Sequence, residues 1–393
     1  MAAMLMTSSR RHPPLNFMKK PCWKVGILSI LSVMLVMLYI SSKNLTLVQH
    51  PIMVKMVERM SKIQESLGIQ SNYSALEPSY PVPFERRYNE SGCYKRKPVV
   101  AIAPWQRVQY GGRWNGLKLP VLVMAGGGNL GNIMSNYASI YAIGRAYNVT
   151  VRINKGMHQQ LMSIFPNMTI NALLNSTKGI QKLAFLRHYV YGNVEAAAAG
   201  LLGPHIFSVH GCPVEVQLFH AYSCEIRKEF TFSPDFQEKV KEFWLAKRDF
   251  VGDAVRVGFH IRRGDYIRYA RKRGRKLPNE TYYENAMNFY KERFNNVVFV
   301  IASNDREYIN KTFENHTDVI FVPGTNREED MAILASCDHS IMTVGTFSFW
   351  TAYLAGGYVV YPGDFYIPNY PVQKERFERA HMDYFVPISQ KPL

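Results

Sequence analysis

The part of the chain after residue 254 shows a regular alternation that limits the folds open to it. Short runs rich in β-branched residues occur at residues 255–261, 297–302, 319–322, 340–344 and 358–361. Helical patterns lie between them at residues 282–294, 306–313, 328–335 and 347–354. Strands that alternate with helices are typical of a parallel, doubly wound sheet. The sequence therefore predicts an α/β part over residues 255–393.

A second α/β part is expected over residues 96–254. Residues 117–125 form a strand-like run, residues 126–132 are rich in glycine, and residues 133–147 have helical spacing. Farther along, residues 235–247 carry apolar side chains on one helical face: Phe236, Val240, Phe243 and Trp244. No internal repeat or low-complexity tract is visible, which excludes solenoid folds.

An uncharged and strongly apolar run occupies residues 25–42. As a helix it would be about 27 Å long, enough to cross a thin bilayer. Basic residues precede it without any acidic residue: Arg10, Arg11, Lys19, Lys20 and Lys24. By the positive-inside rule, residues 1–24 form a cytosolic tail and the chain after residue 42 is lumenal. The alternative is a cleaved signal peptide, but no Ala-x-Ala-like cleavage site follows the run.

Nine Asn-x-Ser/Thr sequons follow the apolar run: Asn44, Asn72, Asn89, Asn148, Asn167, Asn175, Asn279, Asn310 and Asn315. Their number agrees with a lumenal, glycosylated chain. Residues 43–95 contain three of these sequons, have no strand pattern and fit an extended stem. A short apolar stripe at 3-4-3-4 spacing lies within the stem: Met53, Met56, Met60, Ile63 and Leu67. Two interpretations remain for it, a homodimer through a coiled coil or a lone amphipathic helix.

The five cysteines divide between the two sides of the predicted membrane. Cys22 lies on the cytosolic side, and the four lumenal cysteines are Cys93, Cys212, Cys224 and Cys337. An even number in an oxidising compartment predicts two disulfides, with three pairings open. No Cys-x-x-Cys or His-rich spacing suggests zinc.

A formal net charge of +17 indicates anionic partners. It does not distinguish nucleic acid, lipid surfaces and phosphorylated small molecules. The predicted lumenal location makes nucleic acid an unsuitable partner.

Two adjacent arginines, Arg262 and Arg263, directly follow the strand predicted at residues 255–261. They belong to the segment His260-Ile261-Arg262-Arg263-Gly264-Asp265-Tyr266. Ligands of open α/β sheets bind at this end of the strands. The planar arginine fork matches phosphate oxygens and keeps its charge at neutral pH, which suits a departing pyrophosphate. The alternative is a charged surface loop, because more cations follow: Arg268, Arg271, Lys272, Arg273, Arg275 and Lys276. We interpret that later run as a solvated face or an acceptor-side loop.

Two further segments run from a strand through small residues into a helix. Residues 126–131 are suited either to cradling a phosphate with backbone N–H groups or to a tight turn, and both interpretations stay open. In residues 340–350, Thr346 and the first-turn N–H groups are candidates for another phosphate oxygen. The aromatic side chains of this segment, Phe347, Phe349 and Trp350, are expected to pack in the core.

Three ordered motifs resemble the galactoside α1,2-fucosyltransferases of glycosyltransferase family 11. The segment from His260 to Tyr266 resembles the His-x-Arg-Arg-x-Asp signature shared by α1,2-, α1,6- and protein O-fucosyltransferases. Residues 128–138 resemble the Gly-x-Leu-Gly-Asn-x-Met-x-x-Tyr-Ala motif of the α1,2 branch. Residues 340–357 resemble its Thr-Phe-x-x-Trp-x-Ala-Tyr-Leu-Ala-Gly-Gly block. Asn129 and Ser348 depart from the usual Arg and Gly of these motifs.

The resemblance implies a GT-B-like pair of Rossmann-type domains and transfer of fucose, with inversion, from GDP-β-L-fucose to the 2-OH of a terminal galactose on a glycan. It implies no metal or other cofactor, and no Asp-x-Asp metal signature occurs in the sequence. Arg262 would bind the β-phosphate, and Asp265 would act as the general base or orient Arg262. The remaining donor-site candidates are Gly128, Gly131, Asn132, His260, Arg263, Asn304, Asp305, Thr346 and Phe347. Among these, Asn304 or Asp305 would read guanine.

Membership would make the chain a single-pass type II protein of the Golgi membrane with a lumenal catalytic region. Two other functions stay open, a protein O- or core-glycan fucosyltransferase and an inactive Golgi protein that binds a glycan or a nucleotide. Residues 150–250 and 266–281, where acceptor specificity would lie, carry no recognisable pattern.

Overall fold

The computed structural model describes residues 98, 100–173, 181–184, 192–211, 214–368 and 370–391. The chain divides into two compact units, Met1–Glu85 and Arg86–Leu393, and every described residue belongs to the second. The predicted cytosolic tail, apolar run and stem with its stripe lie outside the described residues. Among the described helices, none combines the length and apolarity needed to span a bilayer.

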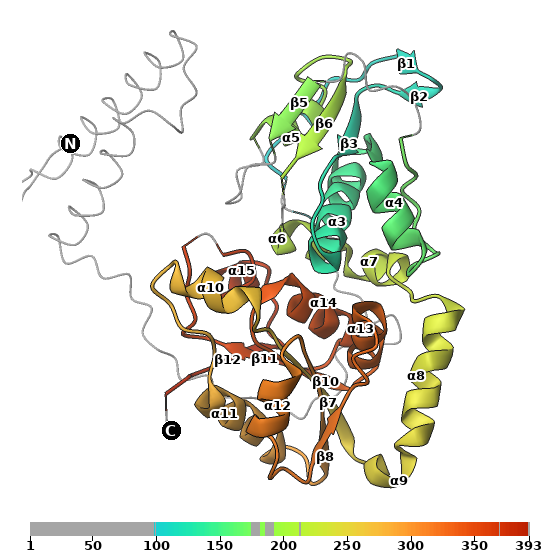
Figure 1. Ribbon diagram of the computed structural model, residues 1–393. Helices are drawn as coiled ribbons and strands as arrows, with labels where there is room; N and C mark the ends of the chain where they lie inside the picture. Colours follow the sequence, from blue (N-terminus) through green and yellow to red (C-terminus); the bar gives the residue numbers. More distant parts are fainter. Residues whose placement is uncertain are drawn as a thin grey trace, which may run out of the picture. The chain divides into compact units, whose positions relative to one another are not determined.

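Six parallel strands form the larger sheet, in the order β12-β11-β10-β7-β8-β9 (Figure 1). They are β7 (Val255–Ile261), β8 (Val297–Ser303), β9 (Val319–Phe321), β10 (His339–Met342), β11 (Val359–Pro362) and β12 (Phe385–Ile388). The chain runs outward from β7 to β9 and then returns to the other side of β7 as β10. This reversal creates a switch point between β7 and β10, where open α/β sheets bind ligands. The parallel sheet predicted from the sequence is confirmed.

Helices connect these strands: α10 (Asp265–Arg271), α11 (Glu280–Lys291), α12 (Arg306–Thr312), α13 (Arg327–Ala335), α14 (Gly345–Ala355) and α15 (Lys374–Arg379). Three of them begin with an Asn or Asp whose side chain accepts a backbone N–H of the first turn, namely Asn279, Asp305 and Asn326. Such caps satisfy donors that a helix start leaves unpaired. They fix the points at which the chain turns away from the sheet.

Four parallel strands form the smaller sheet, in the order β4-β3-β6-β5. They are β3 (Val121–Met124), β4 (Thr150–Ile153), β5 (Gln181–Ala184) and β6 (Ile206–His210). The single strand predicted over residues 117–125 is wrong. Its first part, β2 (Leu117–Lys118), pairs with β1 (Arg113–Trp114), and Pro120, which has no N–H to donate, separates β2 from β3.

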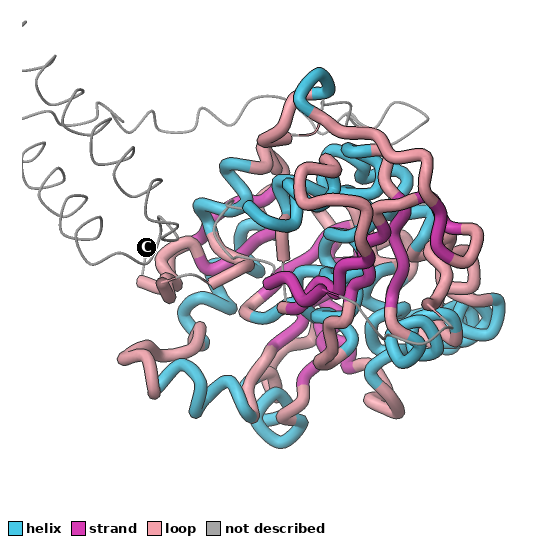
Figure 2. Tube along the Cα trace, turned by 90° about the horizontal axis from the view of Figure 1, so that it is seen from above, coloured by secondary structure: helices cyan, strands magenta, loops and turns pink. Residues whose placement is uncertain are grey.

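Helices α3 (Leu130–Tyr147), α4 (Lys155–Met162) and α5 (Gly192–Ala198) accompany the smaller sheet. The segment between the sheets is helical: α6 (Val216–Phe219), η2 (His220–Tyr222), α7 (Ser223–Glu229), α8 (Pro234–Ala246) and α9 (Arg248–Val251). A short helix, η1 (Pro104–Gln106), precedes β1. In the view of Figure 2, helices lie on all sides of the strands.

The largest hydrophobic core contains residues of both sheets. Leu122 and Met124 of β3 belong to the same buried cluster as Phe349 and Trp350 of α14. The Trp350 indole donates to Ser135 Oγ of α3 at 2.8 Å, so even its polar atom is paired inside the core. Helix α3 therefore packs on α14, and the first turn of α3 meets the first turn of α14.

The prediction that the four lumenal cysteines form two disulfides is wrong. Cys337 is a free thiol, buried among Val298, Val300 and Leu334 and out of reach of another cysteine among the described residues. Cys224 is disulfide-bonded, and its partner lies outside the described residues.

Candidate functional site

Thr343 joins the two strands at the switch point of the larger sheet. Its hydroxyl donates to the carbonyl of His260 at 3.2 Å and accepts the backbone N–H of Arg262 at 2.9 Å. The end of β7 is therefore fixed to the end of β10 immediately before the two arginines leave the sheet. The sequence motifs did not single out Thr343, because its role depends on a contact between distant segments.

The Arg262 guanidinium is partly exposed at this edge, with 23% of the side chain accessible. One of its amino groups donates to Asp265 Oδ1 at 2.7 Å, and Asp265 itself is 64% accessible. The Tyr266 ring lies 5.4 Å from the guanidinium carbon, at cation–π distance. Because one N–H of five is used by this pair, the remaining donors are available for an anionic oxygen.

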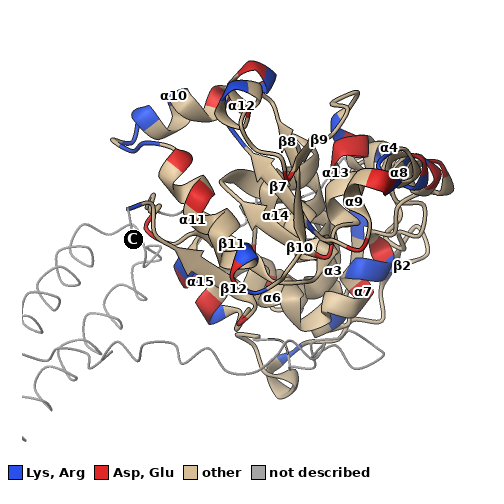
Figure 3. Ribbon diagram, turned by 90° about the horizontal axis from the view of Figure 1, so that it is seen from below, with Lys and Arg blue, Asp and Glu red and all other residues tan. Residues whose placement is uncertain are grey.

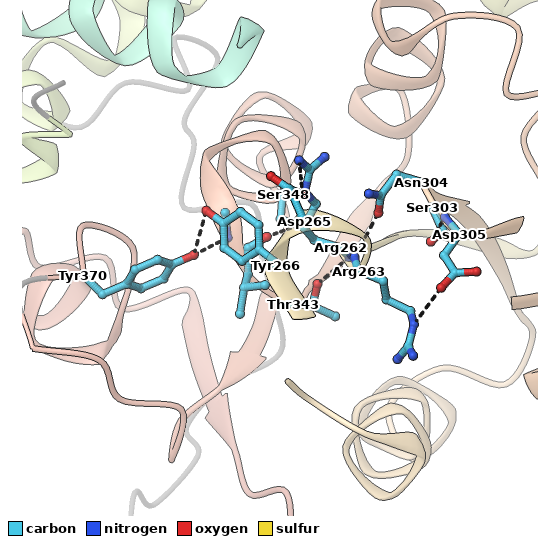
Figure 4. Close-up of polar contacts among 12 residues, drawn as sticks. Arg262, Arg263, Asp265, Tyr266, Ser303, Asn304, Asp305, Thr343, Ser348 and Tyr370 are labelled. Carbon is cyan, nitrogen blue, oxygen red and sulfur yellow. Dashed lines mark hydrogen bonds and ion pairs between the residues drawn. The ribbon is translucent and has the colours of Figure 1, made fainter. Parts of the chain in front are cut away.

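The Arg263 side chain leaves the backbone in another direction (Figure 4). Its Nε donates to Asp305 Oδ2 at 3.1 Å, and its guanidinium carbon lies 3.4 Å from the centre of the Tyr308 ring. Its backbone N–H donates to Asn304 Oδ1 at 2.9 Å. Asp305 also accepts the N–H of Tyr308 with its other oxygen. Asn304 and Asp305 thus hold Arg263 in place, and guanine recognition by them stays a prediction.

Glycine is required at position 264. The residue has φ +47°, and a Cβ there would lie 2.3 Å from the Asn304 side-chain nitrogen. This conformation is strained for residues with a Cβ. Gly264 therefore allows the chain to turn sharply so that Asp265 begins α10 beside Arg262.

His260 is buried in β7, with 5% of its surface accessible. Its Nδ1 lies 2.5 Å from Ser348 Oγ of α14, and its ring centre lies 4.6 Å from that of Phe347. Burial, together with the nearby Arg262 charge, lowers the pKa of His260 to about 3. The imidazole is therefore neutral and adds no charge to the site.

Asn132 and Thr346, predicted from separate motifs, are in contact. Thr346 Oγ1 donates to Asn132 Oδ1 at 2.8 Å. A Cβ on Gly131 would lie 2.6 Å from the Thr346 carbonyl carbon and 2.7 Å from the Phe347 nitrogen. Gly131 thus allows the two backbones to approach closely. Gly128 has φ +115°, which supports the tight-turn interpretation of the glycine run and leaves phosphate binding untested.

Tyr370, which no sequence motif singled out, lies at the start of α14 together with Tyr266 of the arginine segment. Tyr370 Oη accepts the backbone N–H of Gly345 at 2.5 Å and lies 3.5 Å from Tyr266 Oη. Burial raises the pKa of Tyr370 well above its usual value, so the phenol stays protonated. Tyr370 therefore ties α14 to α10 beside the Arg262–Asp265 pair.

Asp330 is a second residue missed by sequence reasoning. It lies in the first turn of α13 and accepts the backbone N–H of Gly324 at 3.2 Å. Burial raises the pKa of its carboxyl to about 6. Such a perturbed carboxyl near the carboxyl ends of the strands is a candidate functional group. In the sequence, Asp330 is marked only by its place in a run of three acidic residues at the start of a helix. Acidic residues are common at helix starts because they interact favourably with the helix dipole.

A cavity of about 350 Å³ lies near the start of α3 and is not lined by any predicted site residue. Its lining comes from α3, α4, α8 and the loop and first turn of α13: Leu130, Gln160, Ser163, Ile164, Phe236, Asn326, Arg327 and Glu328. Within the described part of the chain, no three His, Cys, Asp or Glu residues gather as a metal site.

Comparison with solved structures finds matches at low sequence identity. A structure of POFUT1 in complex with GDP-fucose is 12% identical, with 60% of this chain and 93% of that chain covered and a TM-score of 0.41. A mutant of Arabidopsis thaliana FUT1 in complex with GDP is 13% identical, with 63% and 71% covered and a TM-score of 0.42.

Sequence comparison finds closer relatives. The galactoside 2-alpha-L-fucosyltransferase SEC1 of Bos taurus is 30% identical over 291 residues, which cover 70% of this chain and 76% of that protein. The galactoside alpha-(1,2)-fucosyltransferase 2 of Sus scrofa is 31% identical over 264 residues, which cover 63% and 73%. The profile of glycosyl transferase family 11 matches residues 101–385, which include the smaller sheet, the larger sheet up to the first residue of β12, and all three motifs. The chain therefore belongs to glycosyltransferase family 11.

Proposed function

We propose that this chain transfers fucose from GDP-β-L-fucose to the 2-OH of a terminal galactose on a glycan, forming an α1,2 linkage with inversion. Membership of family 11 and the names of its relatives support this activity. The observation that carries it is Arg262, a partly exposed arginine fork fixed at the switch point of a parallel sheet. An arginine held there is suited to the negative charge that develops on a departing diphosphate.

In this mechanism Arg262 binds the β-phosphate and stabilises the leaving group. Ion pairing with Asp265 holds the guanidinium in one orientation, so little reorganisation is needed when charge develops. We propose orientation of Arg262 as the main role of Asp265. Removal of the acceptor hydroxyl proton is its alternative role, and a carboxylate that is 64% accessible is open to both.

The donor pocket is proposed to lie between the two sheets, in a GT-B-like arrangement of Rossmann-type domains. His260, Thr346 and Phe347 would border it from the larger sheet, and Gly128, Gly131 and Asn132 would do so from the start of α3. The contact between Thr346 and Asn132 supports this grouping. Arg263, Asn304 and Asp305 would support the pocket from β7 and β8, with guanine recognition assigned to Asn304 or Asp305.

The test uses the full-length chain in detergent with GDP-fucose and lactose. We expect GDP release and a fucosylated product in the presence of EDTA, because the proposed mechanism needs no metal. Replacing Arg262 with Ala should lower kcat/KM by at least about a hundredfold, the usual effect of removing a charge-stabilising donor. The matched control is Arg248→Ala, which removes an exposed arginine from α9. Retained activity in folded Arg262→Ala would refute the mechanism.

An acceptor panel distinguishes this activity from fucosylation of a protein hydroxyl or a core glycan. The panel contains lactose, a xyloside-linked galactose and folded small protein domains. Transfer to the galactosides and not to the protein domains is expected. Mass spectrometry after mild fragmentation assigns the linkage to O2.

We also propose a single-pass, type II orientation in the Golgi membrane. The apolar run at residues 25–42 and the sequons that follow it support this orientation. Five sequon asparagines lie among the described residues, and all five are exposed: Asn148, Asn167, Asn279, Asn310 and Asn315. Digestion with an N-glycosidase should lower the apparent mass, and protease added outside sealed vesicles should spare residues 43–393. Complete digestion of residues 43–393 would show that the chain has the opposite orientation in the membrane.

A further inference from the structure

A dense cationic segment follows the Arg262–Asp265 pair along the chain. We call it the basic turn, residues 268–276, and it contains Arg268, Arg271, Lys272, Arg273, Arg275 and Lys276. No acidic residue lies between Asp265 and Glu280. The basic residues are exposed on the last part of α10 and the loop after it, where the ribbon in Figure 3 is coloured blue at several positions.

These cations are not neutralised by the surrounding protein. No residue of the basic turn forms an ion pair with a carboxylate among the described residues. Arg273 alone is fixed, with its guanidinium carbon 3.7 Å from the centre of the Tyr269 ring and one amino group donating to the Tyr269 carbonyl. The other five charges face solvent. Like charges three or four residues apart, such as Arg268 with Arg271 and Lys272, destabilise a helix.

Stabilisation of helix α10 accounts for only some of the cations in the basic turn. Arg268 and Arg271 lie in the last turn of α10, where the helix dipole favours cations. Arg273, Arg275 and Lys276 lie beyond the helix end, where this effect has faded. Their charge therefore needs another explanation.

The basic turn lies close to the proposed reaction site. Helix α10 begins at Asp265, which pairs with Arg262, and at 1.5 Å per residue Arg268 and Arg271 lie roughly 5 and 9 Å along its axis. These separations are comparable to the screening length of about 8 Å at physiological salt. A molecule held at Arg262 is therefore within reach of the field of these cations. Tyr266, which lies beside Arg262, and Tyr269, which belongs to the basic turn, are 5.1 Å apart between ring centres.

We propose that the basic turn binds an anionic group on the acceptor, so that the preferred substrate is an acidic glycan carrying a sulfate or carboxylate near its terminal galactose. This inference rests on the proposed function. The anion would lie on the turn while the galactose occupies the reaction site beside Arg262.

Sugar chemistry fits this surface better than a lipid surface does. Proteins that dock on membranes insert exposed apolar side chains beside their cations. None of the exposed large apolar residues of the described chain belongs to the basic turn; they are Trp105, Val108, Leu201, Leu202, Leu245, Phe250 and Tyr366. The basic turn has charge without an apolar anchor, which suits a hydrated, water-soluble anion.

The experiment compares two acceptors, N-acetyllactosamine and the same disaccharide with a 6-sulfate on its N-acetylglucosamine. Full-length enzyme is assayed as wild type, as the basic-turn variant and as a charge-matched control. The basic-turn variant carries Arg271→Gln, Lys272→Gln, Arg275→Gln and Lys276→Gln. The control removes four exposed cations from other surfaces through Lys118→Gln, Lys155→Gln, Arg248→Gln and Lys374→Gln.

The wild type should prefer the sulfated acceptor in kcat/KM by about tenfold or more, through a lower KM, with the preference shrinking as salt rises. The basic-turn variant should lose that preference while its kcat/KM for the neutral acceptor and its KM for GDP-fucose change less than about twofold. The control should keep the preference. The same comparison is repeated with an acceptor that carries a carboxylate in place of the sulfate. If the basic-turn variant loses its preference for both acidic acceptors equally, the turn recognises negative charge rather than sulfate.

Two results would overturn the proposal. The first is equal use of both acceptors by the wild type. The second is a preference that survives in the basic-turn variant. Sedimentation with phosphatidylserine vesicles that is lost in this variant, without any acceptor preference, would assign the turn to a lipid surface instead. Absence of transfer to either acceptor would refute the proposed function itself and is therefore a distinguishable outcome.

Discussion

Thr346 and Asn132 are 214 residues apart in the sequence and are joined by a hydrogen bond of 2.8 Å. Thr346 lies in the first turn of α14, the helix that follows β10 of the larger sheet. Asn132 lies in the first turn of α3, the helix that follows β3 of the smaller sheet. Two helix starts thus meet, with Gly131 as the point of closest approach. Backbone N–H groups at both starts are suited to binding anions.

The Gly131→Ala variant should be destabilised and should bind the donor poorly. The added Cβ would lie under 3.0 Å from backbone atoms of Thr346 and Phe347, which cannot rotate away. Overpacking of this kind costs about 1–3 kcal/mol, so we expect a lower thermal midpoint and a higher KM for GDP-fucose. The control is Gly111→Ala, where a Cβ meets nothing within 4 Å. Equal behaviour of the two variants would show that the helix contact is not needed.

The Asp265→Asn variant distinguishes orientation of Arg262 from proton removal. Asparagine keeps a hydrogen-bond acceptor for the Arg262 amino group but cannot act as a base. If orientation is the role, as we propose, kcat should fall about tenfold and the shape of the pH–rate profile should stay the same. Loss of a general base lowers rates by about 10² to 10⁴ and removes the acidic limb of the profile. Asp249→Asn, on an exposed residue, controls for the loss of one carboxylate.

His260 should make the folded protein less stable in mild acid. Its pKa is about 3 in the native state and about 6.5 in an unfolded chain, so between these values the unfolded state binds more protons. Stability is therefore greatest above pH 6.5 and is lost as the pH falls toward 3. Thermal midpoints between pH 7.5 and 4.5 should drop less steeply for His260→Gln than for the wild type. The exposed His210→Gln variant corrects for the removal of an imidazole, and identical slopes for all three would contradict the burial argument.

Asp330 should have the opposite pH dependence. Its pKa rises to about 6 on folding from an ordinary value of 3.8, so the native state is penalised once the carboxyl ionises. This penalty begins near pH 4, where it is still small, and is complete above about pH 6. Replacing Asp330 with Asn should therefore raise the free energy of unfolding by about 1–2 kcal/mol at pH 7.5, after allowance for partial exposure, and by little at pH 4. Denaturant titrations at both pH values, with Glu314→Gln as an exposed control, measure this difference.

The sequence predicted the elements whose patterns are local. Alternation of β-branched runs and helical spacing placed β7 at its observed bounds and found β8 to β11 within a few residues. Other elements were missed, including β12, α10 and α15. Pro387 lies within β12, and charged residues interrupt α10 and dominate α15, so none of the three shows a clear apolar pattern. Pro120 interrupted a run that looked continuous in hydrophobicity alone.

The candidate site was predictable where charge or glycine marked it. Arg262 and Asp265 are close in sequence and in space, and Gly131 stood in a recognisable motif. The residues that hold the site in place were not predictable from the sequence. Thr343, Ser348 and Tyr370 lie far along the chain from the groups that they contact, and no local pattern marks them as partners. The same limit applied to Cys337, since its apolar surroundings are created by folding.

The shared hydrophobic cluster has a consequence for synthesis of the chain. Leu122 of β3 and Phe385 of β12 belong to one core, although nearly the whole globular sequence separates them. Residues of the first sheet leave the ribosome long before Trp350 and Phe385 are available to cover them. The nascent chain must therefore be kept from aggregating until its last residues emerge. A premature stop before residue 385 would remove Phe385 from a core that also contains residues of the first sheet.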